Sequence, residues 1–377
     1  VPGDRVGLVL PVGPDALVCT LGALAVGAVV SSVSPEFGAP SIVDRLGQLE
    51  PRVLVAAPSY GWNGKHFHRS DNVAEVVRAL PSLTLVLTAG EEPDPTITDA
   101  AHCDVQALAP ALAADVEPIF ERLPFDHPAY VLFSSGTTGK PKCLIHRGGG
   151  VLLKHLVEVG LHADVRAGDR LLYYTTTSWM MWNWEVSCLA LGATLVLHDG
   201  APTYPDAPAL FDSARLTGAT HLGLSARVLD HMKGEGVALA PHVGPMLRQV
   251  LVTGSPLSVP TAEWLADQLG PAIMINPISG GTDLVGVFVG GDPTRPFHAG
   301  EMTGPMLGTA VDVYTEAGVH GDRAVRSEHG GIAILGRSDA TLNVGAVTTS
   351  STIRVSPSHS WPNARLSPTT GWSASAA

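Results

Sequence analysis

Residues 134–142 read Ser-Ser-Gly-Thr-Thr-Gly-Lys-Pro-Lys, and they follow directly on an apolar run, Ala129–Ser134. A short apolar run that ends in turn-forming residues predicts a buried β-strand. Glycine lets the backbone approach a ligand closely, while exposed N–H groups and hydroxyls donate hydrogen bonds to phosphate oxygens. Lys140 and Lys142 add positive charge at the same place. The stretch therefore predicts a phosphate-binding loop at the end of a strand.

A Walker loop and an ordinary surface loop are the two other interpretations of this stretch. A Walker loop requires GxxxxGK followed by Ser or Thr. Here Gly139-Lys140 is followed by Pro141, and the position five before Gly139 is Ser134 rather than glycine, so the Walker pattern fails at both ends. The second interpretation is an ordinary flexible surface loop, which stays open as the alternative to phosphate binding.

Short apolar runs alternate with helix-like segments on both sides of the loop. Before it, the predicted strands are Val6–Leu10, Val29–Val33, Arg52–Ala57 and Leu83–Thr88, and the predicted helices are Pro14–Gly27, Pro40–Leu49 and Asn72–Leu80. After it come a helix near Gly149–Gly160 and strands at Arg170–Thr177, Ala193–His198, His221–Leu224, Gln249–Gly254 and Ile273–Ile278. This alternation predicts an α/β fold with largely parallel sheets. The irregular, acidic Pro93–Asp126 is predicted to connect two sub-structures.

Composition narrows the class of protein. The 377 residues are 45% hydrophobic and 15% charged, enough for a large core. A net charge of −12 argues against a nucleic-acid partner but not against a nucleotide ligand. The four scattered cysteines, with no CxxC pair, are typical of reduced thiols and predict a cytoplasmic protein. Ala16–Val33 is the most apolar stretch, and it is predicted to be a buried helix running into a strand, with no membrane partner.

The two ends of the chain differ from its middle. It begins at Val1 without Met, so we expect that an N-terminal segment of the natural protein is absent. Val344–Ala377 holds 13 Ser or Thr among 34 residues and has no apolar period, which predicts a disordered or non-native tail. The predicted organisation is a nucleotide-binding domain over 1–317, a remnant of a further region over 318–343, and the tail over 344–377.

Four further stretches carry residues suited to ligand binding. They are Thr175–Asn183 (TTTSWMMWN), Val252–Leu257 (VTGSPL), Ile278–Asp283 (ISGGTD) and His320–Asp322 (HGD). Each has a plainer interpretation: core packing for the Trp and Met side chains, a turn for Gly-Ser-Pro, and a solvated carboxylate for Asp283. A hydroxyl beside a carboxylate, as in Thr282-Asp283, can also contact a phosphate and hold Mg²⁺.

Together these stretches resemble the adenylate-forming superfamily, which includes the acyl-CoA synthetases. SSGTTGKPK followed by Cys143-Leu144-Ile145-His146 resembles the signature loop of this superfamily. TTTSWMMWN resembles the corresponding segment of acetoacetyl-CoA synthetases. The resemblance implies layered α/β subdomains with a smaller β-rich part, and a missing C-terminal lid domain. The resemblance covers most of residues 1–343. It is interrupted near residue 318, where relatives are expected to carry several tens of additional residues.

The resemblance also implies roles for individual residues. Those expected at the ATP phosphates are Ser134, Ser135, Gly136, Thr137, Thr138, Gly139 and Lys142. Gly254, Ser255 and Pro256 are expected to border adenine, Asp322 to bind the ribose, and Arg337 to face the nucleotide, with Asp339 as the hinge. Trp179, Met180, Ser279 and Gly280 are expected to line the acid pocket. Thr282, Asp283 and Lys142 are expected to be catalytic, with Asp283 as the metal ligand.

The implied reaction is the ATP-dependent ligation of acetoacetate to coenzyme A through an acyl-adenylate, with Mg²⁺ as cofactor. Relatives use a lysine near their C-terminus at the α-phosphate, whereas the five lysines here are Lys65, Lys140, Lys142, Lys154 and Lys233. We therefore expect impaired turnover in this chain. The alternatives are a non-catalytic nucleotide-binding remnant and another small-acid ligase, for acetate or propionate.

Overall fold

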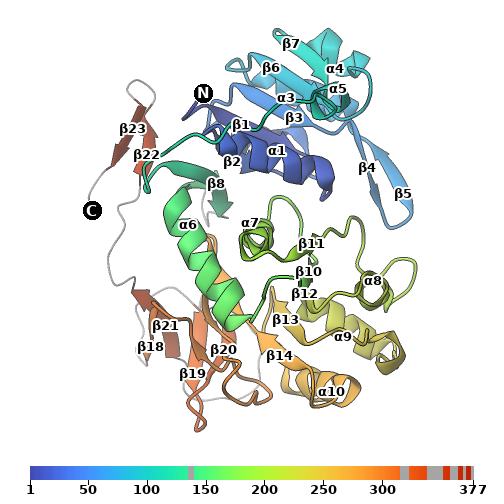
Figure 1. The fold of residues 1–377 in the computed structure, drawn as a ribbon, viewed down its shortest axis with the longest axis vertical. Coiled ribbons are helices and arrows are strands. Elements are labelled where there is room, and N and C mark those ends of the chain that lie inside the picture. The colour runs from blue at the N-terminus through green and yellow to red at the C-terminus, as the bar shows by residue number, and fades with distance from the viewer. Residues whose placement is uncertain (135–139, 315–321, 338–350, 357–363, 368–370, 375–377) are drawn as a thin grey trace.

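The computed structural model describes residues 1–134, 140–314, 322–337, 351–356, 364–367 and 371–374. Two parallel sheets lie one above the other, with a β-rich part at the C-terminal side (Figure 1). This is the α/β fold with largely parallel sheets that the sequence predicts, and that prediction is confirmed.

The first sheet has seven strands in the order β7-β6-β3-β1-β2-β8-β9, and only β9 is antiparallel to its neighbour. Its strands are β1 (Arg5–Val9), β2 (Val29–Ser32), β3 (Val53–Ala56), β6 (Leu85–Thr88), β7 (Asp104–Ala107), β8 (Pro128–Ser134) and β9 (Lys142–Arg147). The helices of this region are α1 (Pro14–Ala25), α2 (Ala39–Leu46), α3 (Ser70–Ala79), α4 (Pro95–Ala100) and α5 (Leu108–Leu112). A hairpin of β4 (Ser59–Trp62) and β5 (Lys65–His68) projects from this sheet (Figure 1).

The second sheet has five parallel strands in the order β11-β10-β12-β13-β14. They are β10 (Arg170–Tyr173), β11 (Thr194–Val196), β12 (His221–Ser225), β13 (Gln249–Thr253) and β14 (Met274–Pro277). Its α-helices are α7 (Met180–Val186), α8 (Ala209–Thr217), α9 (Ala226–Gly234) and α10 (Val259–Leu269), and its 3₁₀ turns are Ser187–Leu191 and Ala240–His242. Helix α6 (Gly148–His155) leaves the first sheet after β9 and continues as a π-helix, Leu156–His162.

The β-rich part consists of shorter antiparallel sheets. One holds β15 (Ser279–Gly281), β16 (Gly286–Gly290) and β17 (Gly304–Pro305). Another holds β18 (Ala310–Tyr314), β19 (Asp322–Arg326), β20 (Ile332–Arg337) and β21 (Ser351–Ser356), and a third pairs β22 (Ala364–Ser367) with β23 (Gly371–Ala374). Three strands thus lie in the segment predicted to be disordered or non-native, which has no strand pattern in its sequence. The non-native origin of that segment stays a prediction.

Several local predictions needed correction. The connection predicted to be irregular contains α4, β7 and α5, and β7 forms the edge of the first sheet, where a strand needs fewer apolar residues. Helix α1 does run into β2, but it is only partly buried, because Val18 and Leu21 are exposed. Among the described residues, no helix is both long and apolar enough to cross a bilayer.

A single apolar core joins the two sheets. It contains side chains of β1 and β8, such as Leu8 and Leu132, together with Leu171 of β10 and the α7 tryptophans Trp182 and Trp184. Because fully buried aromatic side chains contribute several kcal/mol each, this shared core fixes one sheet against the other. The carboxyl ends of β8 and β13 are positioned by the same packing.

Glu185 is a buried carboxyl group in this core, and neither of its oxygens has a hydrogen-bond partner among the described residues. Burial raises its pKa well above the ordinary value, although the backbone of Tyr173 lowers it in part. The folded state therefore keeps Glu185 protonated at pH values where the unfolded chain ionises it, so its contribution to stability falls as pH rises.

We expect Glu185→Gln to match the wild type at about pH 4.5 and to be more stable above it, by about 1.4 kcal/mol per pH unit until the folded-state pKa is reached. The amide removes the cost of holding a proton that the unfolded chain releases. Urea unfolding midpoints at pH 4.5, 5.5, 6.5 and 7.5 measure the trend, with exposed Glu75→Gln as the control. A Glu185→Gln advantage that does not grow with pH would show that the group is ionised in the folded state.

Candidate functional site

The predicted phosphate loop is the connection between β8 and β9, which form an antiparallel pair. Residues 135–139, which include Ser135, Gly136, Thr137, Thr138 and Gly139, lie outside the described residues. The residues flanking the loop are described, and Ser134 is directly opposite Lys142 in the strand register. Facing residues in an antiparallel pair have Cβ atoms about 5 Å apart, so the predicted hydroxyl and the predicted cation lie together at the loop's base.

The two lysines of the loop have different neighbours. Lys140 forms an exposed ion pair with Asp44 of α2, with 3.7 Å between Nζ and Oδ1. Lys142 is exposed and has no carboxylate within ion-pair distance in the part of the chain that the structure describes. Of the two ammonium groups, Lys142 is therefore the one available to an anionic ligand.

The Thr282-Asp283 segment lies beside β9, the second strand of the loop hairpin. The contact is His146 of β9, which is mostly buried, and burial lowers its pKa to about 4. The backbone of Thr282 and the carboxylate of Asp283 oppose that shift because they favour the protonated ring. His146 therefore stays neutral near pH 7. It is the residue of the loop hairpin that lies against the predicted metal-binding segment. Asp283 itself is exposed, so its carboxylate is open to a ligand.

Close backbone packing shapes the segment that precedes Asp283. Gly280 of β15 pairs with Val287 of β16, and a Cβ at Gly280 would lie only 2.0 Å from the Gly286 carbonyl oxygen. Only glycine fits at this position. The predicted acid-pocket residues Ser279 and Gly280 are thus in a strand. Just before this strand, Thr253 of β13 donates a hydrogen bond to the Ile278 carbonyl at 2.8 Å.

Trp179 brings two of the predicted stretches together. It precedes α7 and packs on Gly254, where an added Cβ would lie 3.2 Å from its Cη2 atom. Gly254 has φ +84°, a left-handed conformation that favours glycine. The predicted adenine segment, Gly254-Ser255-Pro256, therefore adjoins the predicted acid pocket. Met180 lies instead in the core shared by the two sheets, and its predicted role in the pocket stays a prediction.

A cavity of about 370 Å³ opens next to these residues. Its lining comprises Ser32, Phe37, Arg45, Phe133, Tyr174, Thr175, Thr176, Ser178 and Trp179. Phe133 directly precedes Ser134, the last residue of β8, so the cavity reaches the start of the predicted phosphate loop. Arg45 stacks on Phe37, with 4.8 Å from its guanidinium carbon to the ring centre. Neither Phe37 nor Arg45 belongs to a recognisable motif, so neither could be predicted from the sequence.

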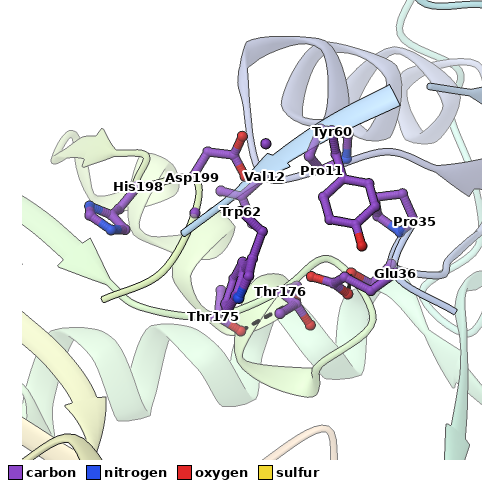
Figure 2. Close-up of a pocket in the computed structure, with 13 residues that line it drawn as sticks. Pro11, Val12, Pro35, Glu36, Tyr60, Trp62, Thr175, Thr176, His198 and Asp199 are labelled. Atoms are coloured by element: carbon purple, nitrogen blue, oxygen red, sulfur yellow. Dashed lines mark hydrogen bonds between the residues drawn. The ribbon is translucent and has the colours of Figure 1, made fainter. Parts of the chain in front are cut away.

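A second, much smaller pocket lies between the two sheets and is lined with acidic groups. Figure 2 shows Glu36 near Thr176, with Tyr60 and Trp62 of the β4–β5 hairpin above and His198-Asp199 to one side. Burial raises the pKa of Asp199, and Glu36 raises it further. Two neighbouring carboxylates make this pocket unsuitable for phosphate.

Asp322 and Arg337, predicted at the ribose and the nucleotide, are on adjacent strands. The antiparallel register of β19 and β20 places these two residues directly opposite each other. Their side chains, and the whole of Asp339, lie outside the described part of the structure. The backbone therefore brings the two predicted positions together, and their roles stay predictions.

Comparison with known proteins agrees with the fold. The model of the AMP-binding enzyme family matches residues 1–338. The chain is 38% identical to an acetoacetyl-coenzyme A synthetase of Rhizobium meliloti (strain 1021), over 92% of this chain and 60% of that protein. A malonamoyl-CoA synthetase of Penicillium aethiopicum is 33% identical, over 91% of this chain and 56% of its own. A solved structure of the acetoacetyl-CoA synthetase from Streptomyces lividans superposes with a TM-score of 0.83 at 38% identity, over 91% of this chain and 60% of that one.

The chain spans about 60% of the length of the curated relatives it matches. The alignment with the Rhizobium protein has 402 positions but uses only 92% of the 377 residues here, so that relative has several tens of positions with no counterpart in this chain. The predicted jump near residue 318 would account for them and stays a prediction. The matched residues include the loop hairpin, the Thr282-Asp283 segment and both parallel sheets. The chain therefore belongs to the AMP-binding, adenylate-forming enzyme family, and within it is similar to acetoacetyl-CoA synthetases.

Proposed function

We propose that this chain binds ATP with Mg²⁺ and activates a short acid as its adenylate, the first half of an acid–CoA ligase reaction. The observation that supports this most is the juxtaposition at the loop hairpin. Lys142 lies opposite Ser134 at the base of the loop, and His146 of the same strand packs against Thr282-Asp283. A cation and a carboxylate with a neighbouring hydroxyl thus flank one phosphate-binding loop.

The proposed chemistry is a displacement at the α-phosphate. The acid's carboxylate oxygen attacks the α-phosphorus, the bond to the bridging oxygen breaks, and pyrophosphate leaves. The thiol of coenzyme A then displaces AMP from the acyl carbon. Negative charge builds up on the phosphoryl oxygens in the first step, so a cation already in place lowers the barrier. Lys142 is proposed to supply that charge at the β- and γ-phosphates.

Asp283 and Thr282 fit a magnesium ion that arrives with the nucleotide. Mg²⁺ prefers oxygen ligands and is commonly held by one or two carboxylates together with substrate phosphates. In the described part of the chain, no group of three metal-ligating side chains exists. The ion would neutralise charge on the phosphates, and the role of Asp283 would be to hold it beside the loop.

The acid is proposed to be a short 3-oxo acid or its amide analogue, with acetoacetate favoured. The relatives are named for acetoacetyl-CoA and malonamoyl-CoA, and both acids carry a carbonyl two carbons from the carboxylate. The cavity beside Trp179 offers hydroxyl donors from Tyr174, Thr176 and Ser178 for such a carbonyl. Acetate and propionate lack that carbonyl and would leave the donors unpaired, which lowers selectivity for them.

Acid-dependent pyrophosphate release from ATP tests the proposal. Wild-type chain is assayed with acetoacetate, malonamate, acetate and propionate at equal concentrations. Faster release with acetoacetate or malonamate supports a 3-oxo acid ligase. Faster release with acetate or propionate would support a different small-acid ligase. Saturable ATP binding without release for any acid would leave nucleotide binding as the activity of this chain.

The two loop lysines provide a matched pair of variants. Lys142→Ala is expected to weaken ATP binding about 10- to 100-fold, since a hydrogen bond to a charged group contributes about 1.5–3 kcal/mol. Lys140→Ala, two residues away and equally exposed, removes the same charge but only breaks the ion pair with Asp44. Titration calorimetry with ATP measures both. Equal losses would mean that net charge, rather than the position of Lys142, determines the affinity.

A further inference from the structure

The helix that follows the phosphate loop carries four polar side chains that face inward. They are Lys154 and His155 of α6 and Glu158 and His162 of the π-helix, and we call them the anchor residues. Glu158 is only 1% exposed and His155 is fully buried. Charged side chains are almost never buried to this extent unless they are paired, so the partners of the anchor residues explain their position.

Glu158 binds the backbone of β16 directly. The Val287 N–H donates to both of its carboxylate oxygens at 3.0 Å. Lys154 forms an ion pair with the same carboxylate, with 2.6 Å from Nζ to Oε1, and also donates to the Val287 carbonyl at 2.9 Å. The indole N–H of Trp184 donates to Oε2 at 2.9 Å. Lys154 and Glu158 thus bind both backbone groups of one residue.

The two histidines form hydrogen bonds with the same segment, on either side of Val287. His155 contacts the Val285 carbonyl through Nε2 and Ser187 Oγ through Nδ1, the latter at 2.8 Å. His162 donates from Nδ1 to the Gly291 carbonyl at 2.8 Å, and its Nε2 accepts from the Leu307 N–H at 2.9 Å. The anchor residues therefore hold the backbone from residue 285 to residue 291, which begins two residues after Asp283.

The held segment contains a conformation that needs such support. Val285 has φ +47°, which is a left-handed conformation and a clear outlier for a β-branched residue. Strained backbone of this kind persists where the surroundings over-determine it, and it clusters at functional sites. Gly286 follows, and a Cβ there would lie 2.7 Å from both Glu158 Oε1 and Lys154 Cε. The anchor thus fits tightly against the turn that carries Asp283.

Stability alone does not account for a buried carboxylate paired with a partly exposed lysine at this place. Apolar residues of similar volume stabilise a core as well or better, because they avoid the desolvation of two charges. A carboxylate with fixed partners instead sets the position of the backbone it binds. π-helical turns are rare and occur frequently at functional sites. The arrangement is therefore suited to positioning rather than to added stability.

We infer that Glu158, together with Lys154, is a positioning residue that fixes the Thr282-Asp283 turn against the phosphate-loop hairpin. This inference rests on the proposed function, in which Asp283 holds Mg²⁺ at the ATP phosphates. The connection is short in sequence on both sides. The loop hairpin continues directly into α6 and its π-helical extension, which together carry the anchor residues, and the anchored strand follows closely after Asp283. A single helix thereby sets the distance between the proposed cation and carboxylate.

The test compares two buried carboxyl groups. Glu158→Gln keeps the shape but cannot form the ion pair, and Lys154→Met removes the other charge at a partly exposed position. Glu185→Gln is the matched control, since Glu185 is equally buried but has no hydrogen bond to β16 among the described residues. ATP affinity is measured in Mg²⁺ and in EDTA, and amide hydrogen exchange is followed over residues 282–291.

We expect Glu158→Gln and Lys154→Met to reduce the Mg²⁺-dependent gain in ATP affinity about 10- to 100-fold, the range typical of residues that orient a metal ligand. Affinity in EDTA stays at the wild-type value, and exchange over 282–291 becomes faster. Wild-type behaviour of both variants in both measurements would overturn the inference. So would an equal loss in Glu185→Gln, because any buried carboxyl would then have the same effect.

If the wild-type chain binds ATP with the same affinity in Mg²⁺ and in EDTA, the result contradicts the proposed role of Asp283. It does not contradict the positioning role of the anchor residues. Hydrogen exchange then decides the inference by itself. Faster exchange over 282–291 in Glu158→Gln, with none in Glu185→Gln, supports it, and unchanged exchange overturns it.

Discussion

Asp283→Asn is expected to abolish most of the Mg²⁺-dependent part of ATP binding, with a loss of at least about 100-fold, the upper end of what residues behind a metal ligand contribute. The carboxylate is exposed beside the loop hairpin, and its neighbour Thr282 supplies a hydroxyl. Replacing a charged oxygen with a neutral amide removes the ligand type that Mg²⁺ prefers. Titration with ATP at saturating Mg²⁺ and in EDTA separates this loss from a general loss of affinity.

Asp292→Asn is the matched control for this variant. Asp292 follows the same anchored strand, but its carboxylate accepts hydrogen bonds from the Thr294 N–H and hydroxyl, which close a local turn. The substitution changes net charge by the same amount a few residues away and leaves the site untouched. If Asp283→Asn and Asp292→Asn have equal effects in Mg²⁺, Asp283 is a solvated carboxylate and not a metal ligand.

Trp184→Ala is expected to destabilise the folded chain by about 3–5 kcal/mol, the range measured for removing a large aromatic side chain from a core. Trp184 is 1% exposed and lies in the core that joins the two sheets. Its ring packs edge-on against Tyr173, with 5.8 Å between ring centres, and its indole N–H donates to Glu158. The substitution therefore opens a cavity and removes one donor from a buried carboxylate.

Trp184→Phe divides these two contributions. It keeps an aromatic ring in the core but removes the N–H donor and the second ring of the indole, so we expect a smaller loss of about 1–3 kcal/mol. The Val287 N–H still donates to Glu158 Oε2 in this variant. Urea unfolding followed by circular dichroism compares the two variants with the wild type. Equal losses for Ala and Phe would contradict the packing account, because a phenyl-sized ring would then contribute nothing to the core.

Much of the fold was predictable because its strands are apolar runs bounded by turn residues. The strand Ala129–Ser134 and the loop after it carry that signal most clearly, and the structure places β8 there. Strand β9 was not predicted, because Lys142–Arg147 is charged at both ends and only partly buried. Its pairing with β8 depends on contacts across the sheet, yet it is the register of this pair that sets Lys142 opposite Ser134.

The anchor residues could not have been found from the sequence. Lys154 and Glu158 are four residues apart, a spacing that in a helix is typical of a solvent-exposed ion pair. Only the packing of the π-helix against β16 buries Glu158 and directs it to the Val287 N–H. Arg45 and Phe37 reach the cavity in the same way, through the placement of α2 rather than through a motif. Sequence patterns thus predict which stretches bind a ligand, and tertiary packing determines how these stretches are held.

Titration calorimetry of the wild-type chain with ATP, in Mg²⁺ and again in EDTA, tests the central claim most directly. Binding of one ATP per chain that saturates, with higher affinity in Mg²⁺ than in EDTA, is the predicted result. It would follow from a phosphate loop flanked by Lys142 and by the anchored Asp283 turn. No saturable binding of ATP in either condition would contradict the claim that this loop hairpin is a nucleotide-binding site.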